Sequence, residues 1–90
     1  MSKWELHISE RFNASFKKLD LIIQKRVNIF LQTKLLNSSD PSKLGKPLQG
    51  QLKGLIRYRV GDYRILAQLK HDTFTIIAIE LGHRREIYRH

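Results

Sequence analysis

Two short runs of alternating apolar and polar residues, joined by Gly61 and Asp62, constrain the fold of this chain more than any other feature. The runs are Leu55–Val60 and residues 63–69, and their alternation has the period of a β-strand with one buried face. A glycine followed by a small polar residue favours a two-residue type II′ turn, which joins adjacent antiparallel strands. The sequence therefore predicts a β-hairpin whose register is fixed by its turn.

The predicted register sorts the hairpin side chains onto two faces. The pairs are Val60 with Tyr63, Arg59 with Arg64, Tyr58 with Ile65 and Arg57 with Leu66. One face then carries an apolar set, namely Ile56, Tyr58, Val60, Ile65, Ala67 and Leu69. The other face carries Arg57, Arg59 and Arg64. Because like charges in opposed positions destabilise paired strands, we expect these arginines either to splay into water or to hold an anion between them.

The charge of the whole chain agrees with an anionic partner. Seventeen Lys and Arg face eight Asp and Glu, which gives a formal net charge of +9. This excess favours nucleic acid, an acidic protein or a membrane surface as partner, and RNA is the natural candidate for the arginine face. Ninety residues are enough for one domain, so we expect residues 1–90 to fold as a single unit.

Two kinds of sequence feature are absent, and their absence narrows the classes of protein to which the chain can belong. The chain has no cysteine, which excludes disulfides and thiolate metal ligands. Its first residues lack the apolar run of a signal peptide, and no stretch approaches the ~20 apolar residues of a membrane span. We therefore expect a cytoplasmic protein without a membrane partner.

The N-terminal part of the chain predicts one strand and two helices. Residues 4–8 alternate, with Trp4, Leu6 and Ile8 on the apolar side. Ser9 and Asp20 suit helix N-caps, and four short polar residues followed by Pro41 end the second helix. The first helix, which ends near Leu19, carries apolar residues at helical spacing, namely Phe12, Phe16 and Leu19. The second carries a wider apolar stripe, made of Ile23, Val27, Phe30, Leu31 and Leu35.

The segments around the hairpin complete the expected architecture. Residues 43–54 are predicted as a loop anchored by Leu44, Leu48 and Leu52. After a turn at residues 71–73, residues 74–81 are apolar on both faces apart from Thr75 and Glu80, as in a central strand, and Gly82 ends the strand. Residues 83–90 form either a short helical turn or an extended strap.

The predicted fold class is therefore α+β, in the order β-α-α-β-β-β. Two helices pack on one face of a largely antiparallel four-stranded sheet, and the arginines lie on the other. Residue parity assigns no pairing partner to the strand at residues 4–8.

Most catalytic and metal-binding patterns are missing from the sequence. The histidines, His7, His71, His83 and His90, lack zinc-ligand spacing, and there is no serine nucleophile elbow. The glycines match no phosphate-binding loop, so neither a metal nor a cofactor is expected. For His83, next to a strand-ending glycine, a hydrogen bond that orients the tail is the favoured role. Arginine, lysine and tyrosine remain as functional side chains.

Three motifs together resemble a known protein family. They are KLGKPLQGQLKG, the hairpin RVGDYR and the ending LGHRREIYR. The chain is similar over nearly its whole length to RelE/ParE-type toxins of type II toxin–antitoxin systems, with RelE-like mRNA interferases the closer branch. That resemblance implies a ribosome-dependent endoribonuclease without a metal, in which the 2′-hydroxyl of the message attacks the adjacent phosphodiester. It also implies an acidic antitoxin, messenger RNA and the ribosome as partners.

The resemblance also implies a set of site residues. By position in the motifs, the catalytic residues are Arg57, Arg64, Arg84 and Tyr88. A basic position two residues before Arg57 is Leu55 in this chain, and Lys53 is the expected replacement. The remaining cations of these motifs are expected to bind RNA or the ribosome, namely Lys43, Lys46, Lys53, Arg59, Arg85 and Arg89. ParE-like relatives, which poison DNA gyrase without this basic and tyrosine set, imply a non-enzymatic alternative, and a plain basic RNA-binding module is a third.

Overall fold

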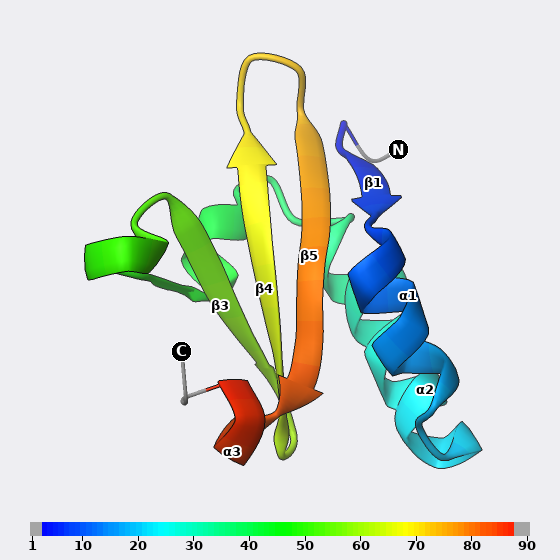
Figure 1. Ribbon diagram of the computed structural model, residues 1–90. Helices are drawn as coiled ribbons and strands as arrows, with labels where there is room; N and C mark the ends of the chain where they lie inside the picture. The colour runs from blue at the N-terminus through cyan, green and yellow to red at the C-terminus, as the bar shows by residue number, and fades with distance from the viewer. Residues whose placement is uncertain (1–2, 88–90) are drawn as a thin grey trace.

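A five-stranded mixed sheet forms the centre of the structure, a computed structural model that describes residues 3–87 (Figure 1). The strand order is β1-β5-β4-β3-β2, with β1 at Glu5–Ile8, β2 at Lys46–Pro47, β3 at Leu55–Val60, β4 at Tyr63–Lys70 and β5 at Thr75–His83. Helices α1 (Glu10–Lys17) and α2 (Leu21–Ile29) cover one face. The α+β class is confirmed. The sheet has one strand more than predicted, because the two-residue β2 pairs with β3.

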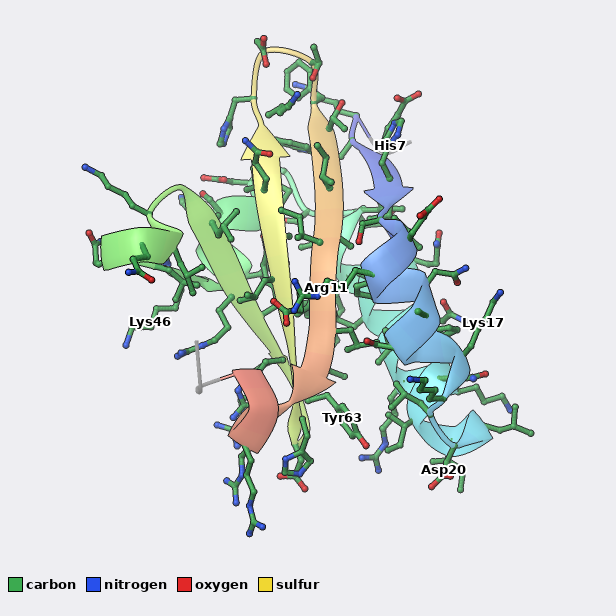
Figure 2. All side chains as sticks on the ribbon, in the orientation of Figure 1. His7, Arg11, Lys17, Asp20, Lys46 and Tyr63 are labelled. Carbon is green, nitrogen blue, oxygen red and sulfur yellow. The ribbon has the colours of Figure 1, made fainter. Side chains whose placement is uncertain are left out.

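The hairpin of β3 and β4 adopts the predicted register. Arg59 pairs with Arg64 and Val60 with Tyr63, and Figure 2 shows Tyr63 at the turn end of the hairpin. Gly61 has a φ of +60°, a value that glycine adopts without strain and that primed hairpin turns require. The apolar face of the hairpin packs in the core, where the side chains of Tyr58, Ile65 and Ala67 are fully buried.

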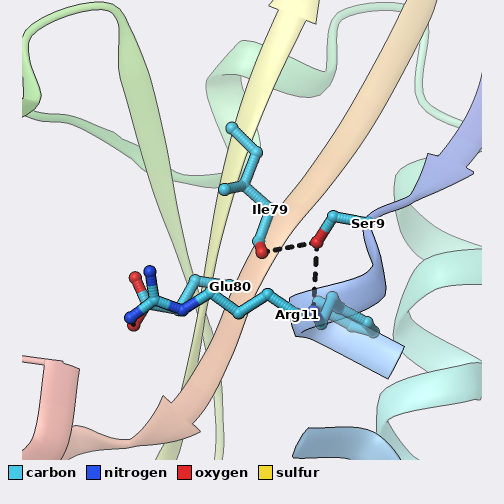
Figure 3. Close-up of polar contacts among 5 residues, drawn as sticks. Ser9, Arg11, Ile79 and Glu80 are labelled. Atoms are coloured by element: carbon cyan, nitrogen blue, oxygen red, sulfur yellow. Dashed lines mark hydrogen bonds and ion pairs between the residues drawn. The ribbon is translucent and has the colours of Figure 1, made fainter. Parts of the chain in front are cut away.

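Strand β5 lies between β4 and β1, as its apolar character predicts, and it contains a bulge. The register shifts between Leu66, which pairs with Glu80, and Ala67, which pairs with Ala78, so Ile79 is the extra residue. The Ser9 hydroxyl donates to the Ile79 carbonyl at 2.7 Å and accepts from the Phe12 backbone N–H at 3.0 Å (Figure 3). Ser9 therefore caps α1, as predicted, and ties that helix to the bulge.

Strand β1 runs parallel to β5 at one edge of the sheet. Trp4, just before β1, is buried and Leu6 is half-buried, whereas Ile8 is 48% exposed, against the sequence prediction. The physical reason is that β1 is an edge strand that ends at Ile8, where the chain turns into α1. Strand β5 continues past Leu81 through Gly82 to His83, two residues beyond the predicted strand.

The second helix continues from α2 into a π-helical segment, Phe30–Leu35, in which the Leu36 N–H donates to the Leu31 carbonyl. Its buried residues, Val27, Leu31 and Leu35, recur at every fourth position. Eight residues span about 2.2 turns of an α-helix, which would rotate Leu35 roughly 80° away from Val27. The wider π-helical turns offset this rotation, so the predicted stripe stays on the sheet. Asp20 stands at the N-cap, but its side chain makes no capping hydrogen bond to a described residue.

The segment between α2 and β3 contains more regular structure than predicted. It forms 3₁₀ turns at Pro41–Leu44 and Gly50–Leu52, with β2 between them. Leu48 and Leu52 are half-buried anchors, as expected, but Leu44 is 45% exposed. After β5, the short helix α3 (Arg84–Ile87) realises the helical alternative for this part of the tail. Among the helices of residues 3–87, none has the length and apolar character needed to cross a membrane.

Tyr58 fixes this irregular segment to the core. Its buried hydroxyl donates to the Pro41 carbonyl at 2.8 Å, and its ring packs against Phe30 at a centroid distance of 5.6 Å. Burial raises the pKa of the Tyr58 phenol well above its usual range, and the negative charge of Asp40 raises it further. The phenol is therefore a neutral donor, and its contribution to stability depends on its remaining protonated.

We predict that Tyr58→Phe lowers the free energy of unfolding by about 1 kcal/mol at neutral pH, the usual contribution of one hydrogen bond. The raised pKa means that this contribution is complete below about pH 10, the value for an unfolded tyrosine, and declines as the pH rises further. Urea denaturation at a series of pH values measures both effects. The variant should lose less stability than the parent above about pH 10. Equal losses in the two proteins would contradict the assignment, and Tyr63→Phe, at a half-buried ring, is the control.

Candidate functional site

A basic pocket lies on the face of the sheet opposite α1 and α2, which is called the open face here. Its volume is about 260 Å³, and its lining residues are Leu44, Gly45, Lys46, Arg57, Arg59 and Arg64. The hairpin register brings the three arginines together, as the sequence predicts. Strand β2 adds Lys46 because Lys46 pairs directly with Arg57. Four cations therefore meet around one pocket, an arrangement suited to a phosphate or another anion.

Arg64 differs from the exposed arginine expected from the sequence. It is 7% exposed, and its Nη1 donates to the carbonyls of Gly61 at 2.9 Å and Tyr63 at 3.0 Å. Both acceptors belong to the turn region of the hairpin, so the guanidinium is held on the backbone next to its own strand. The repulsion between the paired Arg59 and Arg64 is thus relieved in two ways. Arg64 is bound by local hydrogen bonds, and Arg59 remains exposed to solvent.

Gly45 allows Lys46 to reach this position. A Cβ atom at residue 45 would lie 2.6 Å from Ile56 Cγ2, 2.7 Å from the Arg57 carbonyl oxygen and 2.7 Å from Tyr58 Cδ1. Such distances are too short for any side chain, so only glycine lets the chain approach β3 this closely. The sequence analysis did not single out this glycine, because a close approach between distant segments leaves no local signal.

Glu80 places one acid on the open face, at the other end of the row that contains Arg57 and Leu66. Arg11 of α1 reaches across β5 and donates to the Glu80 carboxylate at 3.0 Å (Figure 3). The Glu80 side chain is only 15% exposed, whereas that of Arg11 is 66% exposed. Strict alternation from Ile76 and Ala78 would direct Glu80 into the core. The bulge at Ile79 reverses this direction, which is why sequence parity alone missed it.

The tail begins beside the hairpin turn. The Arg84 backbone N–H donates to the Asp62 carbonyl at 2.8 Å, so α3 starts next to Gly61 and Asp62. Arg84 and Arg85 are exposed, and neither lines the basic pocket. Tyr88, which is expected to be catalytic, and Arg89, which is expected to bind RNA or the ribosome, lie outside the described residues. The geometry thus assembles Arg57, Arg59, Arg64 and Lys46, while Arg84 stands at the adjacent strand end.

His83 lies in a different environment from the arginines. Its Nδ1 accepts a hydrogen bond from the Arg85 backbone N–H at 3.3 Å, so the expected hydrogen bond to the tail is present. Its ring meets that of Tyr63 edge-on at a centroid distance of 5.6 Å. With Tyr63 it lines a separate pocket that includes Ser15, Lys18 and Leu19 from the helical side.

Two expected lysines also lie away from the pocket. Lys43 is exposed in the first 3₁₀ turn, and Lys53 is exposed at the end of the second. Lys53 lies outside β3, which begins at Leu55, and it does not line the pocket. Among the described side chains of residues 3–85, no three His, Asp or Glu residues form a group that would hold a metal ion.

Comparison with known families gives this arrangement a context. The sequence model of the family described as "ParE toxin of type II toxin-antitoxin system, parDE" matches residues 6–88, nearly the whole chain. The chain belongs to the ParE toxin family of type II toxin–antitoxin systems. The predicted relationship to the RelE/ParE superfamily is therefore confirmed.

Individual relatives of this ParE-family chain carry RelE-type names. It is 36% identical over 52 residues to Toxin RelG of Mycobacterium tuberculosis, across 58% of this chain and 60% of that protein. It is 38% identical over 55 residues to Toxin RelE of the same organism, across 61% of this chain and 55% of that protein. The matched region thus spans less than two thirds of either relative. The toxin–antitoxin complex RelBE2 from Mycobacterium tuberculosis contains a similar chain, with a TM-score of 0.84, 26% identity and coverage of 93% and 94%.

Proposed function

We propose that this ParE-family chain is a toxin that cleaves messenger RNA on the ribosome, by attack of the 2′-hydroxyl and without a metal. The observation that carries the proposal is the basic pocket, where Lys46, Arg57, Arg59 and Arg64 converge on the open face. A phosphodiester that reacts gains negative charge on its non-bridging oxygens. Fixed guanidinium groups stabilise that charge without reorganising, since Arg64 is already held by backbone carbonyls.

The proposed reaction needs three operations on the RNA. A base removes the proton of the 2′-hydroxyl, and the resulting oxygen forms a bond to phosphorus. The bond from phosphorus to the 5′-oxygen breaks, the leaving oxygen takes up a proton, and a 2′,3′-cyclic phosphate remains. We assign stabilisation of the phosphate to Arg57 and Arg64, and completion of this clamp to Arg84. Tyr88 is the proposed base, because nearby arginines would favour its phenolate form.

The structure changes one detail of the proposal. Leu55 occupies a position that is basic in related toxins, and Lys53 was the expected substitute. Lys53 lies outside β3, whereas Lys46 pairs with Arg57 and lines the pocket. We therefore assign the missing cation to Lys46. The other cations, Lys43, Lys53, Arg59, Arg85 and Arg89, are proposed to bind RNA or the ribosome electrostatically.

A second candidate function is inhibition of DNA gyrase without nuclease activity. The observation in its favour is the ParE description of the matching family, which contrasts with the RelE-type names of the relatives.

Inducing the chain in cells distinguishes the two functions. We expect new RNA 5′ ends that fall in phase with codons within translated messages, because cleavage would depend on the ribosome. Sequencing of RNA 5′ ends, run beside trapping of gyrase–DNA complexes, measures both outcomes. Gyrase-linked DNA breaks without codon-phased RNA ends would overturn the nuclease proposal.

Substitutions of the proposed site residues separate chemistry from binding. Arg64→Ala and Tyr88→Phe should each lower cleavage on programmed ribosomes by roughly 10² or more, the usual contribution of a general acid–base or stabilising group. Arg64→Lys tests whether the planar guanidinium is required once the charge is kept. Arg59→Ala and Arg85→Ala should instead weaken binding, most strongly at low salt, and make the affinity less dependent on salt, because each removes one cation that would bind RNA electrostatically.

Lys17→Ala is the matched control for these substitutions, because it removes an exposed cation from α1 far from the pocket. Since Arg64 also binds turn carbonyls, urea denaturation of each variant is measured in parallel. Cleavage by Tyr88→Phe at the parental rate would reject the tyrosine base. Wild-type cleavage by a folded Arg64→Ala protein would reject the phosphate role of Arg64.

The proposed protein partner is an acidic antitoxin, part of which folds on the toxin and covers basic surface. The charge of +9 and the membership of a toxin–antitoxin family support this partner. We expect the tagged chain to copurify with an acidic partner from its native host, and the complex to weaken as salt rises. Recovery of the chain at full expression without growth arrest and without such a partner would contradict the expectation.

A further inference from the structure

A second basic groove lies on the helical side of β3. Its volume is about 290 Å³, and its lining residues are Arg26, Ile29, Phe30, Lys34, Arg59, Val60 and Gly61. Three of these residues are cations and none is an acid. Arg26, Lys34 and Arg59 form no ion pair with an acid among residues 3–85, whose side chains the structure describes. The groove therefore presents uncompensated positive charge above an apolar floor.

The π-helical segment explains how one helix supplies both Arg26 and Lys34. Arg26, Phe30 and Lys34 recur at every fourth position, one residue before the buried row of Val27, Leu31 and Leu35. The wider turns that keep the buried row on the sheet also keep this second row aligned beside the hairpin. In a regular α-helix, Lys34 would be rotated roughly 80° away from Arg26. The fold thus holds two cations along one line, with Phe30 between them.

Arg59 joins this groove to the basic pocket. Arg59 lines both the groove and the basic pocket. Strand β2 pairs only with Ile56 and Arg57 of β3, so β3 is an edge of the sheet at Arg59. Cations consequently continue from Lys46, Arg57 and Arg64 on the open face, through Arg59 at the edge, to Arg26 and Lys34 on the helical side. A continuous line of cations past apolar surface is the pattern that follows the backbone of a single-stranded nucleic acid.

We propose that the groove of Arg26, Lys34 and Arg59 is a second RNA subsite, which holds the sugar–phosphate backbone of nucleotides next to those in the basic pocket. Arg26 and Lys34 contact phosphate oxygens, and ribose and base carbons rest on Ile29 and Val60. The inference rests on the proposed RNA-binding function. The proposed subsite also gives the path of the RNA. The RNA leaves the basic pocket around the edge of β3 and does not run along the open face towards Glu80.

The test compares the double variant Arg26→Ala/Lys34→Ala with Lys17→Ala/Lys25→Ala in the full chain. Both remove two exposed cations, but the second pair lies outside the groove. The probe is a fluorescent hexanucleotide with 2′-O-methyl groups, which cannot be cleaved through its own 2′-hydroxyl, so binding is measured whether or not the chain is a nuclease. Fluorescence anisotropy over a range of salt gives the affinity and its salt dependence.

The groove variant should bind the hexanucleotide about tenfold more weakly, and the slope of log affinity against log salt should fall by about 1.4, the value for two lost phosphate contacts on a single strand. The control double variant should retain the parental slope. A labelled dinucleotide, which fills the basic pocket alone, should bind the groove variant as it binds the parent. Circular dichroism confirms that both variants are folded.

Three results would overturn the proposal. Equal losses in the two double variants would show a response to net charge alone. An unchanged slope in the groove variant would show that RNA does not enter the groove. An equal loss of affinity for polyglutamate would show a site for acidic polymers in general, including an acidic protein, and not one for RNA. If the parent chain does not cleave RNA but the groove variant still loses affinity for the hexanucleotide as predicted, the nuclease proposal is rejected and the subsite proposal stands.

Discussion

The pairing of Arg59 with Arg64 across the β3–β4 hairpin is the constraint on which the functional surface depends. The turn at Gly61 and Asp62 sets this register, and two like charges then stand opposite each other. The structure relieves the repulsion unequally. Arg64 is buried against the carbonyls of Gly61 and Tyr63, while Arg59 is left exposed at the strand edge. One register thereby creates a fixed guanidinium in the basic pocket and an exposed one shared with the neighbouring groove.

The rest of the fold distributes charge around this pair. Gly45 admits β2, which places Lys46 beside Arg57, and the bulge in β5 places Glu80 at the far end of the same row. Glu80 is the one acid in the row of Lys46, Arg57 and Leu66, and its carboxylate accepts a hydrogen bond from Arg11 of α1. Positive potential is thus concentrated near β2 and β3. An anionic polymer would be drawn to that side of the molecule.

Local sequence rules predicted the parts of the structure that local chemistry decides. The hairpin register followed from a two-residue turn and strand parity, and the Ser9 cap followed from a hydroxyl placed before a helical pattern. Features that depend on how separate strands meet were missed. The parallel pairing of β1 with β5 joins segments far apart in the chain. The bulge at Ile79 depends on how β5 pairs with β4, and the close approach at Gly45 depends on how the chain passes β3. The burial of Arg64 was missed because strand alternation predicts only the face of the sheet on which a side chain lies. It does not predict the hydrogen bonds that the side chain forms there.

The chemical nature of the cut RNA ends tests the central claim most directly. Purified chain would be added to ribosomes programmed with a defined message, and the ends would be identified by mass spectrometry. Attack by the 2′-hydroxyl predicts a 2′,3′-cyclic phosphate, or the 3′-phosphate formed from it, and a 5′-hydroxyl on the downstream fragment. A single 2′-O-methyl group at the cleaved nucleotide should then abolish the cut. Ends with a 3′-hydroxyl and a 5′-phosphate, or cleavage that persists beside the 2′-O-methyl group, would contradict the account.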